Sequence, residues 1–378
     1  MTTRLILLLT FMAACSPAYA QLGGILNKVQ KAQEQKQKFD ELNITDEEER
    51  KIGEDVSAKI RARFGVVQNG AVHKYVTLVG LSLARESERP KLPWTFIVLD
   101  TDGVNAFASP GGLVHITRGA LGLLKNEAEL AGVLAHEIGH VAHKHTVNAL
   151  RKNKAVQMGT STALKDRGSF LNQLTNKAYE MVLENAFDRG DEVDADKAAV
   201  QYTQKAGYAS ATLADFLTRL DDRNKDQPER NGLFASHPET KERIDKIRQT
   251  AGAKRGANGE ARYKQHINYT AVPITAIAAV EAGAAGLTGS TAKAAGKDDK
   301  GKDKDKDKKG DEPKKKGFGI GSLKQTVAPE KQTAQVSASG GSRGLGPDRA
   351  AKGGSNPSIV KVAAVTDAEV DAFKRALV

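Results

Sequence analysis

The stretch Val133-Leu-Ala-His136-Glu137-Ile-Gly-His140-Val-Ala-His143 places two imidazoles four residues apart, with a carboxylate between them. On a helix, positions i and i+4 lie on one face, one turn apart. The two His side chains can therefore converge on one zinc ion, with Glu137 beside the open position of the metal. This pattern predicts a metal-assisted hydrolase, but three fixed positions also occur by chance, so the rest of the chain has to support it.

The residues around this motif predict a long helix that holds the two His side chains rigidly. Asn126 is a typical helix cap, and Glu127 and Glu129 follow in the first turn, where the helix dipole favours anions. A buried stripe is expected at the apolar positions Leu130, Val133, Leu134, Ile138 and Val141.

A catalytic zinc ion needs a third protein ligand. One class of zinc peptidases uses a His six residues after the second His, with a Gly three residues earlier; Thr146 and His143 stand at these positions, which excludes that class. The other common third ligand is a Glu on a later helix. Glu192 and Asp196 lie one turn apart on such a predicted helix, so one can bind zinc while the other orients a ligand His. An acidic first turn that only complements the helix dipole would look similar.

Two further His residues follow the motif closely. His143 lies on the same predicted helix face as His136 and His140 and could approach the metal, although three ligands and a water already complete a tetrahedron. A role in packing or in supporting the ligands is the alternative for His143, and a structural role is expected of His145.

A small sheet is expected upstream of the motif. Trp94–Leu99 and Leu113–Thr117 are typical strands, Asn105–Ala108 is a short extended piece, and Pro110-Gly111-Gly112 is a turn. His115 lies on the last strand, where both a substrate contact and an ordinary exposed position are compatible with the alternation of side chains. With the helices around it, this sheet predicts an α+β fold that is mainly helical.

Helix signals frame the rest of the chain. Capping boxes predict one helix from Thr45 to about Phe64 and another from Thr366 to Leu377. Helical spacing predicts a helix over Val72–Ser87, whereas Arg151–Leu174 is polar, with helix resuming from Lys177 to Phe187.

The N-terminus predicts export. Arg4, the apolar run Leu5–Ala14 and the small-x-small site Ala18-Tyr-Ala20 form a typical signal peptide over residues 1–20, which favours the periplasm over a buried N-terminal helix. Met12-Ala-Ala-Cys15 resembles a lipoprotein signal box. Lipidation of Cys15, which would tether the protein to a membrane, is therefore the alternative to cleavage after Ala20.

Charge and composition divide the chain. Of the net charge of +11, +9 lies from Ala251 onward, with 23 Lys and Arg against 14 Asp and Glu, so the part before it does not resemble a nucleic-acid binder. The expected segments are a polar lead-in helix (21–41), a catalytic domain (42–250), a docking extension (251–290), a disordered Lys/Asp- and Gly/Ser-rich linker (291–357) and a short strand or helix element (358–378). The linker could also contact anionic lipid or cell-wall polymer.

Together these motifs resemble the zinc metallopeptidases of the CAAX prenyl endopeptidase and HtpX type, peptidase family M48, in its soluble periplasmic branch. The resemblance covers about residues 42–250. The matching motifs are Asn105-Ala-Phe-Ala-Ser-Pro-Gly-Gly112, Asn126-Glu-Ala-Glu-Leu-Ala with His136-Glu-Ile-Gly-His140, Glu192-Val-Asp-Ala-Asp196, and Ser236-His237-Pro238 followed by Arg243.

The resemblance implies a zincin-like (gluzincin) fold with one zinc ion per chain. It implies His136, His140 and Glu192 as ligands and Glu137 as general base, with Asp196 supporting a ligand His. It also implies that His237 assists catalysis, as an oxyanion contact or a gate of the metal. The resemblance also implies that substrate binds along an edge strand, by strand addition, and on the last helix. The implied residues are Gly111, Gly112, Leu113, Val114 and His115 on the strand and Arg243 on the helix.

The expected function is that of an exported zinc endopeptidase acting on polypeptides, such as misfolded or outer-membrane proteins, in envelope quality control. The chain lacks the transmembrane helices of the CAAX and HtpX branches, which argues against membrane-embedded or prenylated substrates. The alternative is a chaperone-like or scaffold protein that binds clients in the groove, with a latent or structural zinc site. No oligomeric state is implied.

Overall fold

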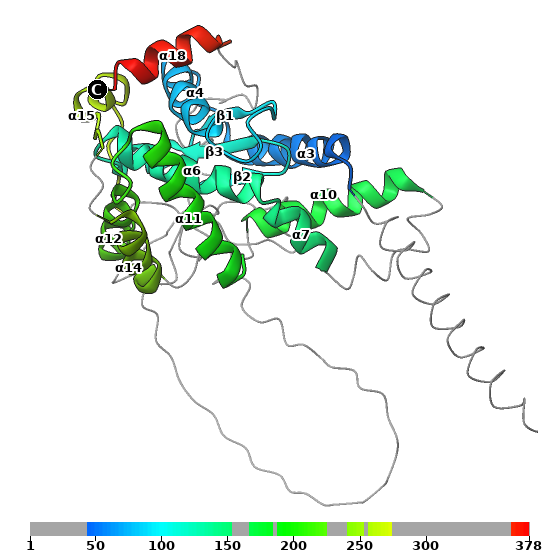
Figure 1. The fold of residues 1–378 in the computed structure, drawn as a ribbon. Helices are drawn as coiled ribbons and strands as arrows, with labels where there is room; N and C mark the ends of the chain where they lie inside the picture. The colour runs from blue at the N-terminus through cyan, green and yellow to red at the C-terminus, as the bar shows by residue number, and fades with distance from the viewer. Residues whose placement is uncertain are drawn as a thin grey trace, which may run out of the picture.

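The computed structural model describes residues 44–152, 166–183, 187–224, 240–252, 256–273 and 364–377. Within these ranges a small sheet is surrounded by helices (Figure 1), as the α+β prediction requires. The first half of the domain contains α3 (Asp46–Phe64), α4 (Gly70–Ala84), β1 (Thr95–Leu99), β2 (Ala106–Ser109), β3 (Leu113–Thr117), α5 (Arg118–Leu123) and α6 (Glu127–Ala142). The second half contains α7 (His145–Lys152), α10 (Arg167–Leu183), α11 (Arg189–Ala206), α12 (Thr212–Asn224), α14 (Thr240–Ala251), α15 (Glu260–His266) and α18 (Asp367–Arg375).

The sheet is mixed and has the strand order β1-β3-β2. β1 pairs with β3 in parallel, with Thr95 opposite Leu113, and β2 pairs with β3 antiparallel, with Ser109 opposite Leu113. β3 is therefore the central strand, and the prediction that residues 111–117 form an edge strand open to substrate is wrong. Because β1 and β2 already use the backbone groups on both sides of β3, no further strand can add there.

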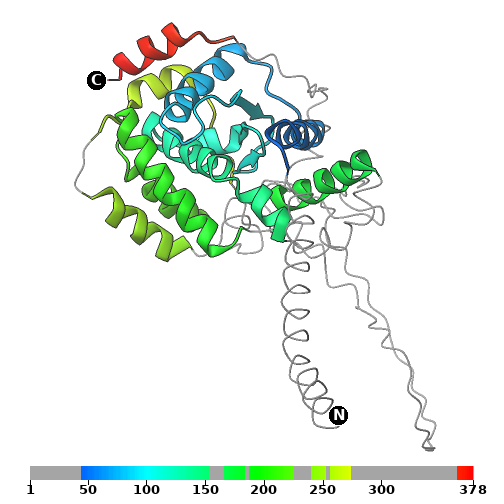
Figure 2. The ribbon, with the colours of Figure 1, turned by 45° about the vertical axis from the view of Figure 1, so that its right-hand side comes forward.

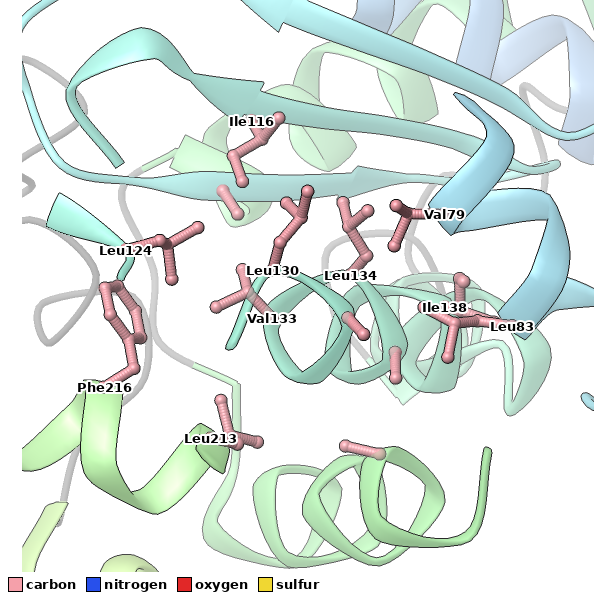
Figure 3. Close-up of a cluster of buried hydrophobic side chains, with 14 of the residues drawn as sticks. Val79, Leu83, Ile116, Leu124, Leu130, Val133, Leu134, Ile138, Leu213 and Phe216 are labelled. Carbon is pink, nitrogen blue, oxygen red and sulfur yellow. The ribbon is translucent and has the colours of Figure 1, made fainter. Parts of the chain in front are cut away.

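Helix α6 occupies the centre of the larger hydrophobic core (Figure 3). Its buried apolar face packs under the sheet, where Leu130 and Leu134 lie close to Ile116 of β3. Residues of α4 and α12 cover its other sides, so the helix is buried all round, including its polar residues. A helix in this position holds its side chains rigidly because close-packed neighbours leave few alternative rotamers.

Several helices begin at the capping residues that the sequence predicts. Thr45 and Glu48 form the predicted capping box of α3, with contacts of 3.0 and 3.2 Å, and Asn126 Oδ1 accepts the Glu129 amide of α6 at 2.9 Å. The capping box at Thr366 likewise begins α18. The sequence predicted a polar stretch over residues 151–174, with helix resuming only at Lys177. This prediction is wrong for residues 167–174, because α10 already begins at Arg167. Phe170, Leu174 and Ala178, spaced by four residues, are buried in the second core cluster, which also contains apolar residues of α3.

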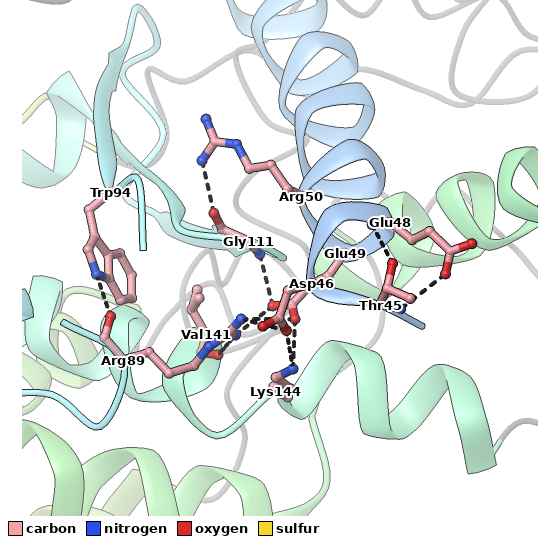
Figure 4. A network of polar contacts seen from close by, with 10 residues as sticks. All are labelled: Thr45, Asp46, Glu48, Glu49, Arg50, Arg89, Trp94, Gly111, Val141 and Lys144. Carbon is pink, nitrogen blue, oxygen red and sulfur yellow. Dashed lines mark hydrogen bonds and ion pairs between the residues drawn. The ribbon is translucent and has the colours of Figure 1, made fainter. Parts of the chain in front are cut away.

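A buried carboxylate joins α3 to the turn before β3 and to the end of α6 (Figure 4). Glu49 is only 1% exposed and accepts the amide of Gly111 at 3.1 Å. Arg89 binds Glu49 at 2.7 Å and also donates to the carbonyl of Val141 at 3.2 Å. Lys144, just beyond α6, lies 3.2 Å from the same carboxylate. The sequence did not indicate this network, which positions the C-terminal end of the motif helix.

The last described helix, α18, packs on α4, which lies far from it in the sequence (Figure 2). Phe373 contacts the Arg262 guanidinium at 3.9 Å from the ring centroid, and Lys74 of α4 pairs with Glu369 at 2.6 Å. Arg262 also donates to Glu127 at 2.6 Å, which connects α15 to the start of α6.

The expected signal peptide, Cys15, the lead-in helix and the linker lie outside the described residues. Among the helices that the structure describes, none has the length and apolar character needed to cross a membrane.

The contact between α6 and α11 predicts a strong effect of enlarging Gly139. A Cβ at this position would lie 3.0 Å from the Cβ of Ala198 and 3.2 Å from the Cα of Ala195, so there is no room for a branched side chain. We expect Gly139→Val to push α11 away, to cost about 1–3 kcal/mol of folding free energy and to weaken zinc binding, since α11 carries Glu192. Urea denaturation and zinc competition measure the two effects.

Gly70→Ala is the matched control, because nothing lies within 4 Å of a Cβ at this first residue of α4. Equal stability and equal zinc affinity in the Gly139→Val and Gly70→Ala proteins would show that the close approach of α6 and α11 does not position the site.

Candidate metal centre

Three side chains from two helices converge in the core of the domain. His136 and His140 lie one turn apart on α6, and Glu192 lies in the first turn of α11. The Nε2 atoms of the two His residues are 3.1 Å apart, and the Glu192 carboxylate lies 3.5 Å from His136 Nε2 and 3.4 Å from His140 Nε2. All three residues are buried, at 4%, 2% and 1% exposure.

These distances fit zinc. Tetrahedral zinc with bonds of about 2.0–2.1 Å requires donor atoms roughly 3.3–3.4 Å apart, close to the three separations observed. Two imidazole nitrogens and one carboxylate also form the donor set of catalytic zinc sites that keep a fourth position for water. The residues of this site therefore fit the metal that the sequence implied.

Each His of the centre has a polar neighbour at its other ring nitrogen. His136 Nδ1 lies 3.0 Å from Asp196 Oδ1, and His140 Nδ1 lies 2.9 Å from His145 Nδ1. The ring of Phe187 stacks on the His140 ring, with 4.1 Å between the centroids. Such contacts determine which nitrogen faces the metal and how the ring is oriented. Asp196 therefore lies where a residue that orients a ligand His is expected.

Arg243 of α14 fixes the two carboxylates of α11. Its guanidinium binds both oxygens of Asp196, at 2.8 and 2.7 Å, and lies 2.8 Å from Glu192 Oε2. Burial raises the pKa of Asp196, but Arg243 and His136 outweigh burial and lower it to about 2. Asp196 therefore stays ionised, and its hydrogen bonds can orient His136.

The centre is strongly acidic around the two imidazoles. Burial lowers the pKa of His136, but the contacts with Asp196 and Glu192 outweigh it and raise this pKa to about 9. The carboxylates thus stabilise a positive charge at His136, and a bound cation would benefit from the same field. Glu137 follows His136 on α6, is 1% exposed, and interacts electrostatically with Arg243.

The remaining predicted site residues do not all gather here. His115 is fully buried in the central strand and its Nε2 lies 2.8 Å from Ser57 Oγ of α3, so the alternative of an exposed strand position was wrong. Burial lowers the pKa of His115 to about 3, which keeps the ring neutral. Gly111 and Gly112 form the turn at φ +73° and +96°, values that favour glycine. His237 lies outside the described residues.

His143 does not join the three ligands. It is the C-cap of α6, and its Nδ1 lies 2.6 Å from Asp194 Oδ2, which His145 Nε2 also approaches, at 3.3 Å. Arg243 was predicted to bind substrate, and that role stays a prediction. What sequence reasoning missed is its salt bridge to Asp196 and Glu192, which no local pattern reveals because α11 and α14 are separate in the chain.

A small pocket opens beside the centre. It is lined by His140 and Val141 of α6, Ala108 and Pro110 at the end of β2, and Glu49, Lys144, Thr146 and Val147. The pocket therefore links the strand next to the turn with one of the ligand His residues.

Comparison with known proteins places this geometry in a family. Residues 71–251 match the model of peptidase family M48. The Yersinia pestis beta-barrel assembly-enhancing protease is 26% identical over 216 residues, which are 54% of this chain and 44% of the relative. The Schizosaccharomyces pombe mitochondrial metalloendopeptidase OMA1 is 26% identical over 204 residues (53% and 60%), and the Escherichia coli metalloprotease YcaL is 28% identical over 160 residues (41% and 61%).

The chain thus matches between 44% and 61% of the length of these relatives, about half. The matched residues include all of α6, α11 and α14, the helices that carry His136, His140, Glu192, Asp196 and Arg243. Both the three-residue donor set and the comparisons agree with the resemblance inferred from the sequence: this chain carries a metallopeptidase domain of family M48.

Proposed function

We propose that this protein is a zinc-dependent endopeptidase that is exported to the periplasm and cuts polypeptides there. The observation that carries the proposal is the convergence of His136, His140 and Glu192 at zinc-like separations, with Glu137 next to them on the same helix. Relatives named for beta-barrel assembly suggest envelope quality control, with misfolded or outer-membrane proteins as substrates.

In this mechanism, His136, His140 and Glu192 would hold the ion, which when bound would act as a Lewis acid and lower the pKa of the attacking water toward about 7. Glu137 accepts a proton from that water as its oxygen attacks the scissile carbonyl carbon. The same carboxyl then gives the proton to the leaving nitrogen as the C–N bond breaks. Asp196 and Arg243 keep His136 and Glu192 in place throughout, and His237 is proposed to stabilise the developing oxyanion.

The route of the peptide is proposed to follow β2 rather than β3. In the described part of the sheet β2 is an edge strand, and Ala108 and Pro110 at its end line the pocket that reaches His140. A peptide in extended form can add to such an edge and bring a carbonyl group toward the ligands. The site residues are almost fully buried, so entry of the peptide requires the groups around the pocket to move apart.

This burial also favours the second candidate, a client-binding protein with a latent zinc site. One experiment separates the two. Purified full-length chain is incubated with β-casein, an unfolded protein, before and after zinc removal with 1,10-phenanthroline, and fragments are identified by mass spectrometry. We expect cleavage that stops on chelation and returns with added zinc.

Binding of casein without fragments would favour the client-binding function, and cleavage that persists after complete zinc removal would contradict zinc catalysis. A variant truncated after residue 273 shows whether the tail represses the site, since its cleavage rate would then exceed that of the full chain.

A further inference from the structure

His145 lies against a zinc ligand because the chain breaks its helix just before it. α6 ends at Ala142 with His143 as its C-cap, Lys144 adopts φ 57°, and α7 begins at His145. In an unbroken helix, five residues turn the side-chain direction by about 140° from that of His140, which would point His145 away. Instead, its Nδ1 lies 2.9 Å from Nδ1 of His140, and the side chain is buried at 4% exposure.

The tautomer of His140 determines which of the two facing Nδ1 atoms donates the hydrogen bond. His140 presents Nε2 to Glu192 and to His136, so a zinc ion held by these groups takes the lone pair of that nitrogen. A neutral imidazole bound through Nε2 carries its hydrogen on Nδ1. That hydrogen faces the ring of His145.

We propose that His145 is a positioning residue that accepts the Nδ1–H of His140 and so holds this zinc ligand in its binding tautomer and orientation. His145 then carries its own hydrogen on Nε2, which lies 3.3 Å from Asp194 Oδ2 and 3.8 Å from Asp191 Oδ1. The inference rests on the proposed zinc site. It extends that proposal to a relay, from His140 through His145 to the carboxylates of α11.

The two ligand His residues are thus supported differently. His136 Nδ1 lies 3.0 Å from a carboxylate, Asp196, which is itself held by Arg243, whereas His140 Nδ1 faces the ring of His145. A carboxylate beside a ligand His adds negative charge and raises the basicity of that His, whereas a neutral imidazole mainly fixes the orientation of the ligand ring. Losing His145 should therefore loosen the His140 ring without changing the charge of the centre.

The same tautomer argues against a second metal ion nearby. His143, His145 and Asp194 bring possible ligand atoms within 4.8 Å of one another, as a metal site would. His145 would have to bind such an ion through Nε2, which places its hydrogen on Nδ1. Two N–H groups would then face each other across 2.9 Å with no acceptor between them. Zinc at the first centre therefore disfavours a metal at the second.

Zinc affinity of the full chain tests the proposal, measured by competition with a chelator of known zinc affinity. We expect His145→Leu to weaken zinc binding by about 10–100-fold, the usual effect of removing such a partner. His145→Asn, whose side-chain oxygen can replace Nδ1 as acceptor, should restore most of the affinity. His266→Leu is the matched control and should bind zinc as the wild type does, because His266 stacks on Tyr75 and touches no member of the relay in the described contacts.

Imidazole nitrogen NMR of the zinc-loaded protein provides the second measurement. We expect one zinc ion per chain and His145 with its hydrogen on Nε2. Unchanged zinc affinity in His145→Leu, a hydrogen on Nδ1 of His145, a second zinc ion bound through this ring, or a chain that binds no zinc would each overturn the proposal. A chain that binds zinc with these signatures but cleaves nothing would contradict the peptidase function and leave the role of His145 supported.

Discussion

Replacing Glu137 with Gln should lower peptide hydrolysis by about 10²–10⁴-fold, the range of a general base, and leave zinc binding intact. Gln keeps the size of the side chain but cannot accept the proton of the attacking water. Glu137 lies outside the three-residue donor group formed by His136, His140 and Glu192, so the metal should remain bound. Initial rates of casein cleavage and the zinc content of the same sample measure both parts of the prediction.

The matched control is Glu47→Gln, because Glu47 is exposed in the first turn of α3. It removes the same charge from the surface and should cleave at the wild-type rate. Cleavage by zinc-loaded Glu137→Gln at a rate near that of Glu47→Gln would rule out Glu137 as the base. Loss of zinc in Glu137→Gln would instead show that this carboxylate helps to hold the metal.

The second large effect is expected at Arg243. Replacing it with Met keeps much of the length and removes the cation that binds Asp196 and Glu192, leaving two buried carboxylates without it. Removing one partner of a buried ion pair typically costs about 3–5 kcal/mol. We expect Arg243→Met to lose stability on this scale in the zinc-free protein, and Arg243→Lys to lose less because it keeps the charge but not the planar fork. Chemical denaturation in the presence of a chelator, followed by circular dichroism, measures both losses.

Arg248→Met controls for the loss of any arginine from α14. Arg248 pairs with Asp215 at 3.5 Å, and both side chains are about half exposed, at 47% and 58%. Such surface pairs contribute about 0–1 kcal/mol, so this variant should remain close to wild type. Equal stability losses in Arg243→Met and Arg248→Met would show that the buried contacts of Arg243 contribute no more than a surface pair.

Local sequence signals predicted several of the helix starts. The capping boxes at Thr45 and Thr366 and the cap at Asn126 marked helix starts correctly, because a cap satisfies amides within the same few residues. The spacing of His136 and His140 likewise depends only on helix geometry. The prediction that β3 is an edge strand was wrong, because the position of a strand in a sheet does not depend on local signals. Strand order is set by pairing between distant segments, and a strand's own residues do not show whether both of its sides are occupied.

The sequence alone determined the chemistry of this protein: two imidazoles one helical turn apart, a carboxylate between them and a carboxylate pair on a later helix. The tertiary structure decided what holds that chemistry. Only the packing of α14 and α11 brings Arg243 to Asp196, and only the backbone turn at Lys144 brings His145 to His140. These contacts depend on how whole helices cross and end, which is settled by side-chain packing over the entire core rather than by any local run of residues.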